Sequence, residues 1–251
     1  MHFNLNGKTA LITGSSKGIG LAIARALYAE GCKVALNSRN LDELTKATEE
    51  FVGSIAVAGD VTQPADAHRI VSEVLNSFHK LDILVCNVGS GRSVAPGNET
   101  AEEWQRMVSL NLWGTTNMVE ASRSALSASK GVIVCMSSIC GIEVVLDAPV
   151  TYSVAKAALN AYVRGIARPL SKQGIRINAV APGNILFDNS VWTKKLNEDP
   201  LAVQKMLERD VSLSRLGVPQ DIASLVVYLS STCASFATGA IWTIDGGQAR
   251  S

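Results

Sequence analysis

The amino-acid sequence predicts an α/β fold, in which a doubly wound parallel sheet of about seven strands lies between two layers of helices. Short runs rich in β-branched residues alternate with longer segments whose apolar residues recur at helical spacing, which is typical of βαβ units. The runs are apolar almost throughout, as expected for strands covered on both faces. Because 251 residues suffice for one large core, we expect a single domain over residues 1–251, a three-layer αβα sandwich.

Each strand is predicted from its own apolar run, and helical patterns separate the runs. The first run, 8–13, leads through a glycine-rich turn into the helical segment "IGLAIARAL". Two later helical segments, 101–128 and 152–172, have wide apolar faces. The other strands are expected at 33–38, 54–59, 82–87, 131–137, 175–181 and 240–245.

The carboxyl edge of such a sheet is where ligands bind. The segment 184–214 has weak strand signals, and we expect it to cover this edge as a substrate lid. Trp192 and Leu196 are candidates for an apolar wall over the substrate. The residues that end the strands, and therefore face the same edge, are Gly14, Ser38, Asp60, Asn87, Ser138 and Pro182.

The composition excludes several classes of protein. A net charge of +1 without basic blocks argues against nucleic-acid and anionic-membrane partners, and no apolar run is long enough to span a bilayer. The first residues lack the pattern of an export signal, so we expect a cytoplasmic protein with a small-molecule partner. The five cysteines lack C-x-x-C spacing and the three histidines stand apart, so neither a metal site nor a Ser-His-Asp hydrolase is expected.

The turn "TGSSKGIG" (13–20) joins the first strand to the first helix. Gly14, Gly18 and Gly20 would let the backbone turn tightly and approach a phosphate, which the helix N-terminus attracts. A plain strand-to-helix turn without a ligand is the alternative. Since the trio stands at the first βα junction of an alternating chain, we expect a bound nucleotide.

The end of the second strand indicates which nucleotide it is. A site selective for NAD carries an acid there to bind the ribose 2′-hydroxyl, whereas this chain has Ser38 and Arg39. Arg39 and Lys17 together would suit a 2′-phosphate, although Arg39 alone is also consistent with a solvated loop residue. We therefore expect NADP(H) rather than NAD(H).

Four polar side chains are candidates for the chemistry. Tyr152 and Lys156 in "YSVAK" share one helix face, and a lysine cation beside the phenol would lower the tyrosine pKa. Ser138 ends a strand, where its hydroxyl would hold the oxygen of a carbonyl substrate. Asn111 lies in a predicted helix, where a polar residue on a wet face is an equally good interpretation.

With these residues in place, nearly the whole chain resembles the short-chain dehydrogenase/reductase family, of the single-domain, Rossmann-type kind. The resemblance rests on "TGSSKGIG", "GDV" (59–61), "NVG" (87–89), "NLWG" (111–114), "SS" (137–138), "YSVAK", "PGNI" (182–185) and the terminal "TGAIWTIDGG". Family members commonly form tetramers, so the resemblance implies a homotetramer.

The resemblance also implies a role for each candidate residue. Tyr152 would be the acid/base, Ser138 would position the carbonyl, Lys156 would bind the cofactor ribose and activate Tyr152, and Asn111 would hold a proton-relay water. The NADP(H) contacts that it implies come from Gly14, Ser16, Lys17, Gly18, Ile19, Gly20, Arg39, Asp60, Val61, Asn87, Gly89, Tyr152, Lys156, Pro182, Gly183 and Ile185.

The chain departs from the family at Phe187, where a threonine that contacts the cofactor is frequent. The activity implied is reduction of a ketone to a secondary alcohol by NADPH, or the reverse, as in 3-oxoacyl-(acyl-carrier-protein) reductases. An acyl-carrier partner would need a basic patch at the entrance, for which Lys130 and Arg168 are candidates. A catalytically silent NADP(H)-binding regulator and an NAD-dependent sugar or polyol dehydrogenase are the alternatives.

Overall fold

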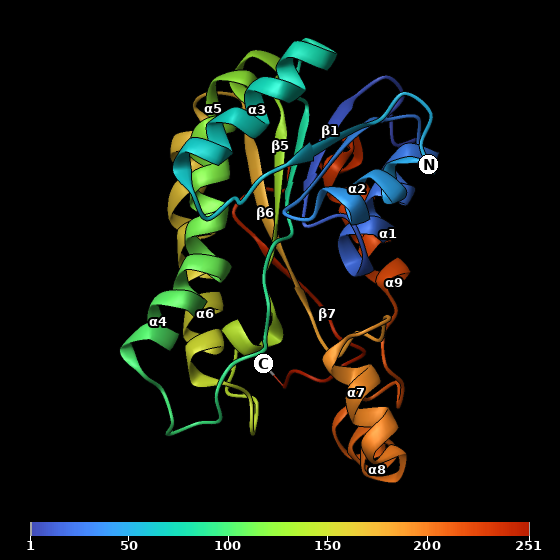
Figure 1. Cartoon of the computed structure of the whole chain (residues 1–251), viewed down its shortest axis with the longest axis vertical. Helices are drawn as coiled ribbons and strands as arrows, with labels where there is room; N and C mark the ends of the chain where they lie inside the picture. Colours follow the sequence, from blue (N-terminus) through green and yellow to red (C-terminus); the bar gives the residue numbers. More distant parts are fainter. Residues whose placement is uncertain (1, 251) are drawn as a thin grey trace.

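The computed structural model describes residues 2–250, whose strands form one parallel sheet in the order β3-β2-β1-β4-β5-β6-β7 (Figure 1). All seven predicted strands are confirmed, and each lies within its predicted run except for one added residue at the end of β6. The bounds are β1 (Thr9–Thr13), β2 (Lys33–Ser38), β3 (Ile55–Ala58), β4 (Ile83–Cys86), β5 (Val132–Met136), β6 (Arg176–Pro182) and β7 (Ile241–Ile244).

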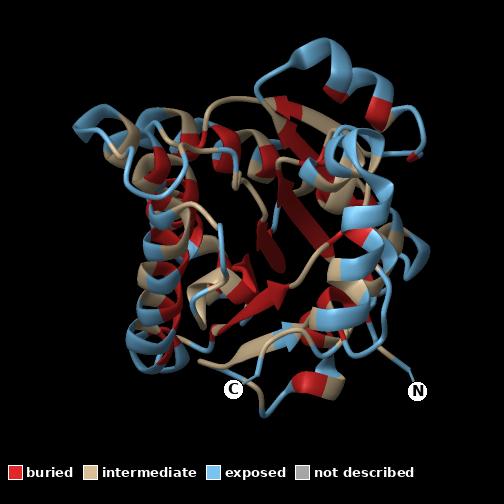
Figure 2. Cartoon of the chain, turned by 90° about the horizontal axis from the view of Figure 1, so that it is seen from below, coloured by how far each residue is buried: buried red, intermediate tan, exposed pale blue. Residues whose placement is uncertain are grey.

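Helices cover both faces of the sheet (Figure 1). One face carries α1 (Gly18–Ala29), α2 (Leu41–Thr48) and α9 (Pro219–Ser230), and the other carries α3 (Pro64–Phe78), α5 (Gly114–Ser129) and α6 (Val150–Ser171). Along β1, Ala10 and Ile12 pack into the first layer, whereas Leu11 packs into the second. Both sides of β1 are therefore apolar, and Figure 2 shows central strands that are buried between helices with exposed outer faces.

The expected continuous helix over 101–128 is wrong in one detail. A π-helical turn, Ser109–Trp113, separates α4 (Ala101–Val108) from α5. Asn111 lies in this turn, fully buried, and its side-chain amide donates to the Met107 carbonyl oxygen at 3.1 Å. Such turns are rare and occur frequently at functional sites.

The segment 184–214 contains two helices, α7 (Val191–Glu198) and α8 (Pro200–Asp210), which stand outside the layers (Figure 1). Side chains cap both helices, because Ser190 accepts from the Thr193 amide and Asp199 accepts from the Ala202 amide. Two short 3-10 turns complete the described elements, η2 (Ile139–Gly141) after β5 and η3 (Thr232–Ala234) after α9.

The order of the strands creates a crevice between β1 and β4. From the edge strand β3 the chain crosses back to pair β4 with β1, and the connecting helices change faces there. Ligands of open α/β sheets bind at such a switch point. Within residues 2–250, no helix combines the length and the apolar character that crossing a bilayer requires.

Candidate active site

The glycine turn lies at this crevice and leaves room for an anion. Gly14 and Gly18 have positive φ angles, +63° and +58°, which favour glycine, and a Cβ on Gly20 would clash with the Gly14 carbonyl oxygen. No side chain caps the start of α1 and its first turn has no acidic residue, so its amide groups remain for a ligand. These features fit a bound phosphate group.

A cavity of about 460 Å³ lies beside the turn, within the size range of small-molecule sites. Its walls come from the glycine turn, the end of β2, the start of α2 and the loops after β3 and β4. Predicted cofactor residues gather here, namely Gly14, Ser16, Lys17, Arg39, Asp60, Val61, Asn87 and Gly89. The other predicted cofactor residues, Gly18, Ile19, Gly20, Tyr152, Lys156, Pro182, Gly183 and Ile185, lie outside its lining.

Both predicted phosphate-binding cations already contact carboxylates. The Lys17 Nζ atom lies 3.1 Å from Glu43 Oε2, and Arg39 Nη1 lies 4.0 Å from Asp60 Oδ2. Glu43 was not among the predicted residues, because the acid expected for ribose binding belongs at the end of β2. The sequence feature that could have pointed to Glu43 is the helix N-cap at Asn40, whose side chain accepts a hydrogen bond from the Glu43 amide.

Three elements bring the four candidate catalytic residues together. Helix α6 carries Tyr152 and Lys156 one turn apart, and the Lys156 Nζ atom lies 5.8 Å from the centre of the Tyr152 ring. A Cβ on Gly89 would lie 2.8 Å from Asn111 Oδ1 and 3.0 Å from Lys156 Nζ, so the π-helical turn and α6 converge there. Ser138, at the start of η2, lies close enough to Tyr152 for its hydroxyl to lower the pKa of that phenol.

Buried hydrogen bonds attach the Ser138 loop to α6. The Ser137 hydroxyl donates to Asn160 Oδ1 at 2.6 Å, and Asn160 Nδ2 donates to the Gly141 carbonyl oxygen at 2.9 Å. A Cβ on Gly141 would come within 2.6 Å of the Lys156 carbonyl carbon, so the two backbones are in contact. Asn160 is 2% exposed and was not among the predicted residues, although it follows Lys156 by one helical turn.

The expected lowering of the Tyr152 pKa is wrong for this structure. Burial raises the Tyr152 pKa to about 12, and the nearby Ser138 hydroxyl only partly opposes this. Burial likewise lowers the Lys156 pKa to about 8. The Lys156 ammonium donates to the Met136 carbonyl oxygen at 2.8 Å rather than to the phenol, so removal from water outweighs its charge. Tyr152 is therefore in its proton-donating form at neutral pH.

The segment after β6 contacts both sides of the crevice. The Phe187 ring lies against the glycine turn, because a Cβ on Gly18 would be 2.9 Å from two of its carbons. Arg92, in the loop after β4, donates to the Asn189 carbonyl oxygen at 2.6 Å. The predicted wall at Trp192 is not purely apolar, because the charged Lys195 Nζ lies 4.7 Å from the Trp192 ring centre.

The suggested basic patch for an acyl carrier is wrong. Lys130 precedes β5, so it lies at the amino edge of the sheet, opposite the crevice. Arg168 lies near the end of α6, roughly 18 Å along the helix from Lys156. Neither residue is beside the site.

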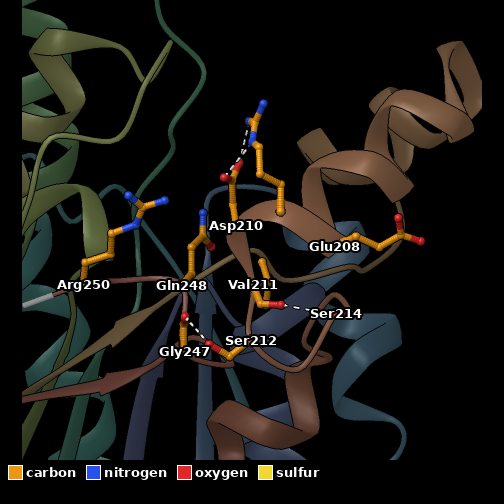
Figure 3. Close-up of a pocket in the computed structure, with 9 residues that line it drawn as sticks. Glu208, Asp210, Val211, Ser212, Ser214, Gly247, Gln248 and Arg250 are labelled. Carbon is orange, nitrogen blue, oxygen red and sulfur yellow. Dashed lines mark hydrogen bonds and ion pairs between the residues drawn. The ribbon is translucent and has the colours of Figure 1, made fainter.

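A second cavity, of about 230 Å³, lies at the C-terminal end of the described chain (Figure 3). Its lining is polar and includes the ion pair between Arg209 and Asp210 and the hydrogen bond from Ser212 to the Gly247 carbonyl oxygen. It contains none of the predicted site residues. The larger cavity is therefore the candidate cofactor site.

Comparisons with known proteins show the family of the chain. Residues 14–249 match the family model described as enoyl-(acyl carrier protein) reductase. The L-rhamnose 1-dehydrogenase (NAD(P)(+)) of Sphingomonas sp. is 35% identical, over 97% of each chain. The 3-oxoacyl-[acyl-carrier-protein] reductase of Synechocystis sp. is 31% identical, over 97% of this chain and 98% of its own.

A solved structure is similar over its full length. The L-sorbose reductase of Gluconobacter frateurii, complexed with NADPH and L-sorbose, is 32% identical, with a TM-score of 0.93 over 100% of both chains. The glycine turn at a strand switch point and the clustered Asn, Ser, Tyr and Lys side chains agree with these similarities. The chain belongs to the short-chain dehydrogenase/reductase family.

Proposed function

We propose that the protein is an NADP(H)-preferring reductase that converts a ketone to a secondary alcohol, with Tyr152 as the acid/base. The observation that carries the proposal is the meeting of Tyr152, Ser138, Lys156 and Asn111 next to a cavity lined by the glycine turn. A cofactor bound in that cavity would reach these side chains at the crevice.

The chain's own residues would manage the proton and the substrate oxygen. The nicotinamide cofactor, when bound, supplies the hydride for the carbonyl carbon. Tyr152, protonated at neutral pH, gives its hydroxyl proton to the oxygen that Ser138 holds. The buried ammonium of Lys156 would stabilise the phenolate that remains, and Asn111 would hold the water that returns a proton.

Two cations support the preference for NADP(H). Lys17 and Arg39 line the cavity, and β2 ends without an acid. The L-sorbose reductase was solved with NADPH, and the L-rhamnose dehydrogenase is named for both cofactors. We regard a sugar or polyol as the favoured substrate class, because two of these relatives act on sugars by name. The homotetramer and the cytoplasmic location stay predictions.

A panel of ketones tests the proposal. Keto-sugars, 3-oxoacyl thioesters and small cyclic ketones are each offered with NADPH and with NADH, and the absorbance at 340 nm is followed. We expect turnover with at least one ketone, with a higher kcat/KM for NADPH. The Tyr152→Phe variant is the control, because it lacks only the phenolic oxygen. It should lose about 10³-fold in kcat and still bind NADPH.

Two results would overturn the proposal. Loss of absorbance that is equal in the Tyr152→Phe variant would exclude Tyr152 as the acid. No turnover with any ketone, despite tight NADPH binding, would favour the regulator.

A further inference from the structure

We infer that Glu43 controls which of the two nicotinamide dinucleotides the protein prefers, by neutralising Lys17 beside the ribose 2′ position. The inference rests on the proposed use of such a cofactor. Glu43 lines the same cavity as Lys17, Arg39 and Asp60. It lies in the first turn of α2 rather than at the end of β2.

The Glu43 carboxylate contacts two residues of the glycine turn. The Lys17 ammonium lies 3.1 Å from Oε2 and 3.4 Å from Oε1. The Ser16 hydroxyl donates to Oε2 at 3.4 Å. The Glu43 carboxylate therefore reaches from α2 to the loop that would hold the cofactor phosphates. There it is ion-paired with Lys17, the cation that the sequence assigns to a 2′-phosphate.

The ion pair between Lys17 and Glu43 is easily broken, but the charge of the Glu43 carboxylate still acts on the site after the pair is broken. The side chains of Lys17 and Glu43 are 64% and 46% exposed, and exposed pairs contribute little free energy. A 2′-phosphate would therefore displace Glu43 from Lys17 with little penalty. The carboxylate remains attached to α2, however, and would repel the phosphate at a distance shorter than the screening length of physiological salt.

The whole 2′ region is balanced in charge. Arg39 faces Asp60 as Lys17 faces Glu43, so the two cations of this region are offset by two carboxylates. A 2′-phosphate brings a double negative charge, whereas the 2′-hydroxyl of NAD(H) is neutral and donates to a carboxylate. The balanced region thus admits both cofactors, and Glu43 takes the place of the acid that is missing after β2.

The test measures the binding of cofactor, not turnover. Dissociation constants for NADPH and NADH are determined by tryptophan-fluorescence quenching for the native protein, Glu43→Gln and Asp42→Asn. Asp42 lies beside Glu43 in the first turn of α2 but does not line the cavity, so its variant loses the same charge on the same element. We expect Glu43→Gln to raise the preference for NADPH about ten-fold, and Asp42→Asn less than about two-fold.

A third variant tests the route through Lys17. Because the inference places the effect of Glu43 on Lys17, the gain from Glu43→Gln should fall to less than about three-fold in the Lys17→Gln background, and a gain that persists there in full would overturn this route. The gain should also shrink at about 0.5 M salt, where exposed charges are screened.

Each outcome decides one of the two proposals. An unchanged preference in Glu43→Gln, or an equal change in Asp42→Asn, overturns the role of Glu43 and leaves the reductase intact. If Glu43→Gln shifts the NADPH preference as expected but the native protein turns over no ketone, the reductase proposal is overturned and the role of Glu43 stands. A native protein that binds neither dinucleotide overturns both.

Discussion

The two edges of the sheet use buried charge in opposite ways. At the amino edge, the Asp82 side chain is 6% exposed and accepts from the Thr9 amide and the Lys8 ammonium, both at 2.9 Å, with Lys80 at 3.2 Å. These donors lower its pKa despite the opposing effect of burial. At the carboxyl edge, Lys156 is 3% exposed with no carboxylate partner within salt-bridge distance among the described residues, and burial lowers its pKa to about 8.

The contrast separates stability from function within one sheet. The charge at the amino edge is fully partnered, so it favours the folded state. The Lys156 ammonium at the carboxyl edge has only part of its hydrogen bonds, so its burial costs free energy of folding. Its remaining N–H donors are available to a ligand. Strained or under-partnered groups of this kind gather at functional sites.

The largest expected effect comes from Lys156→Met, which should lower kcat/KM by about 10³-fold. The same variant should be more stable at pH 7 by about 2 kcal/mol, because the folded pKa of about 8 lies below the unfolded value near 10.4. The unfolded chain binds more protons between these values, so the gain is complete below pH 8 and fades as the pH rises toward 10.4. Urea unfolding at pH 7 and pH 9.5 measures it.

Lys8→Met is the matched control at the other edge. It removes a partner of Asp82, so stability should fall while kcat/KM is unchanged. Destabilisation by both lysine variants at pH 7 would remove the contrast between the edges.

The second prediction concerns Asp82→Ala, which should destabilise the protein by about 3 kcal/mol at pH 7. The lowered folded pKa means that this contribution is present above the unfolded pKa, near 3.9, and is lost as the pH falls through the folded value. Asp82→Asn keeps an acceptor for the Thr9 amide and should lose less. The comparison is by chemical denaturation from pH 7 to pH 2.5, and a loss that does not shrink at all as the pH falls would refute the assignment.

The smallest expected effect is that of Asn160→Ala, at about 2 kcal/mol of stability, because it leaves the Ser137 hydroxyl and the Gly141 carbonyl without their partner. Since the Ser138 loop loses its attachment to α6, kcat should fall about ten-fold while the NADPH dissociation constant stays unchanged. Ser137→Ala removes one of the same bonds and should lower kcat in the same direction. Weaker NADPH binding with an unchanged kcat would contradict this role.

Patterns along the chain were sufficient for the fold, and they singled out four candidate catalytic residues that lie together in the structure and whose roles stay predictions. The apolar runs located the strands, because strands that are buried on both faces are apolar at most positions, with Asn37 and Asn178 among the buried polar exceptions. Spacing on one helix located Tyr152 and Lys156. The π-helical turn at Asn111 was missed, because a shifted hydrogen-bond ladder leaves no mark in the periodicity of a short segment.

Contacts between distant segments were beyond what a pattern shows. Glu43 acts on a turn from another element, and the Asn160 bonds depend on how a loop folds back on α6. The pKa of Tyr152 was mistaken for the same reason, since the neighbouring cation was visible in the sequence and the degree of burial was not.

The contact between Gly141 and the Lys156 backbone has a consequence for how the site tolerates change. Because main chain rests on main chain, the spacing between Ser138 and Tyr152 is set by rigid scaffolding rather than by adjustable rotamers. Val144 and Leu146, in the loop that follows, are exposed and lie outside this contact. Substitutions in that loop should thus leave the separation of the Ser138 and Tyr152 hydroxyls unchanged.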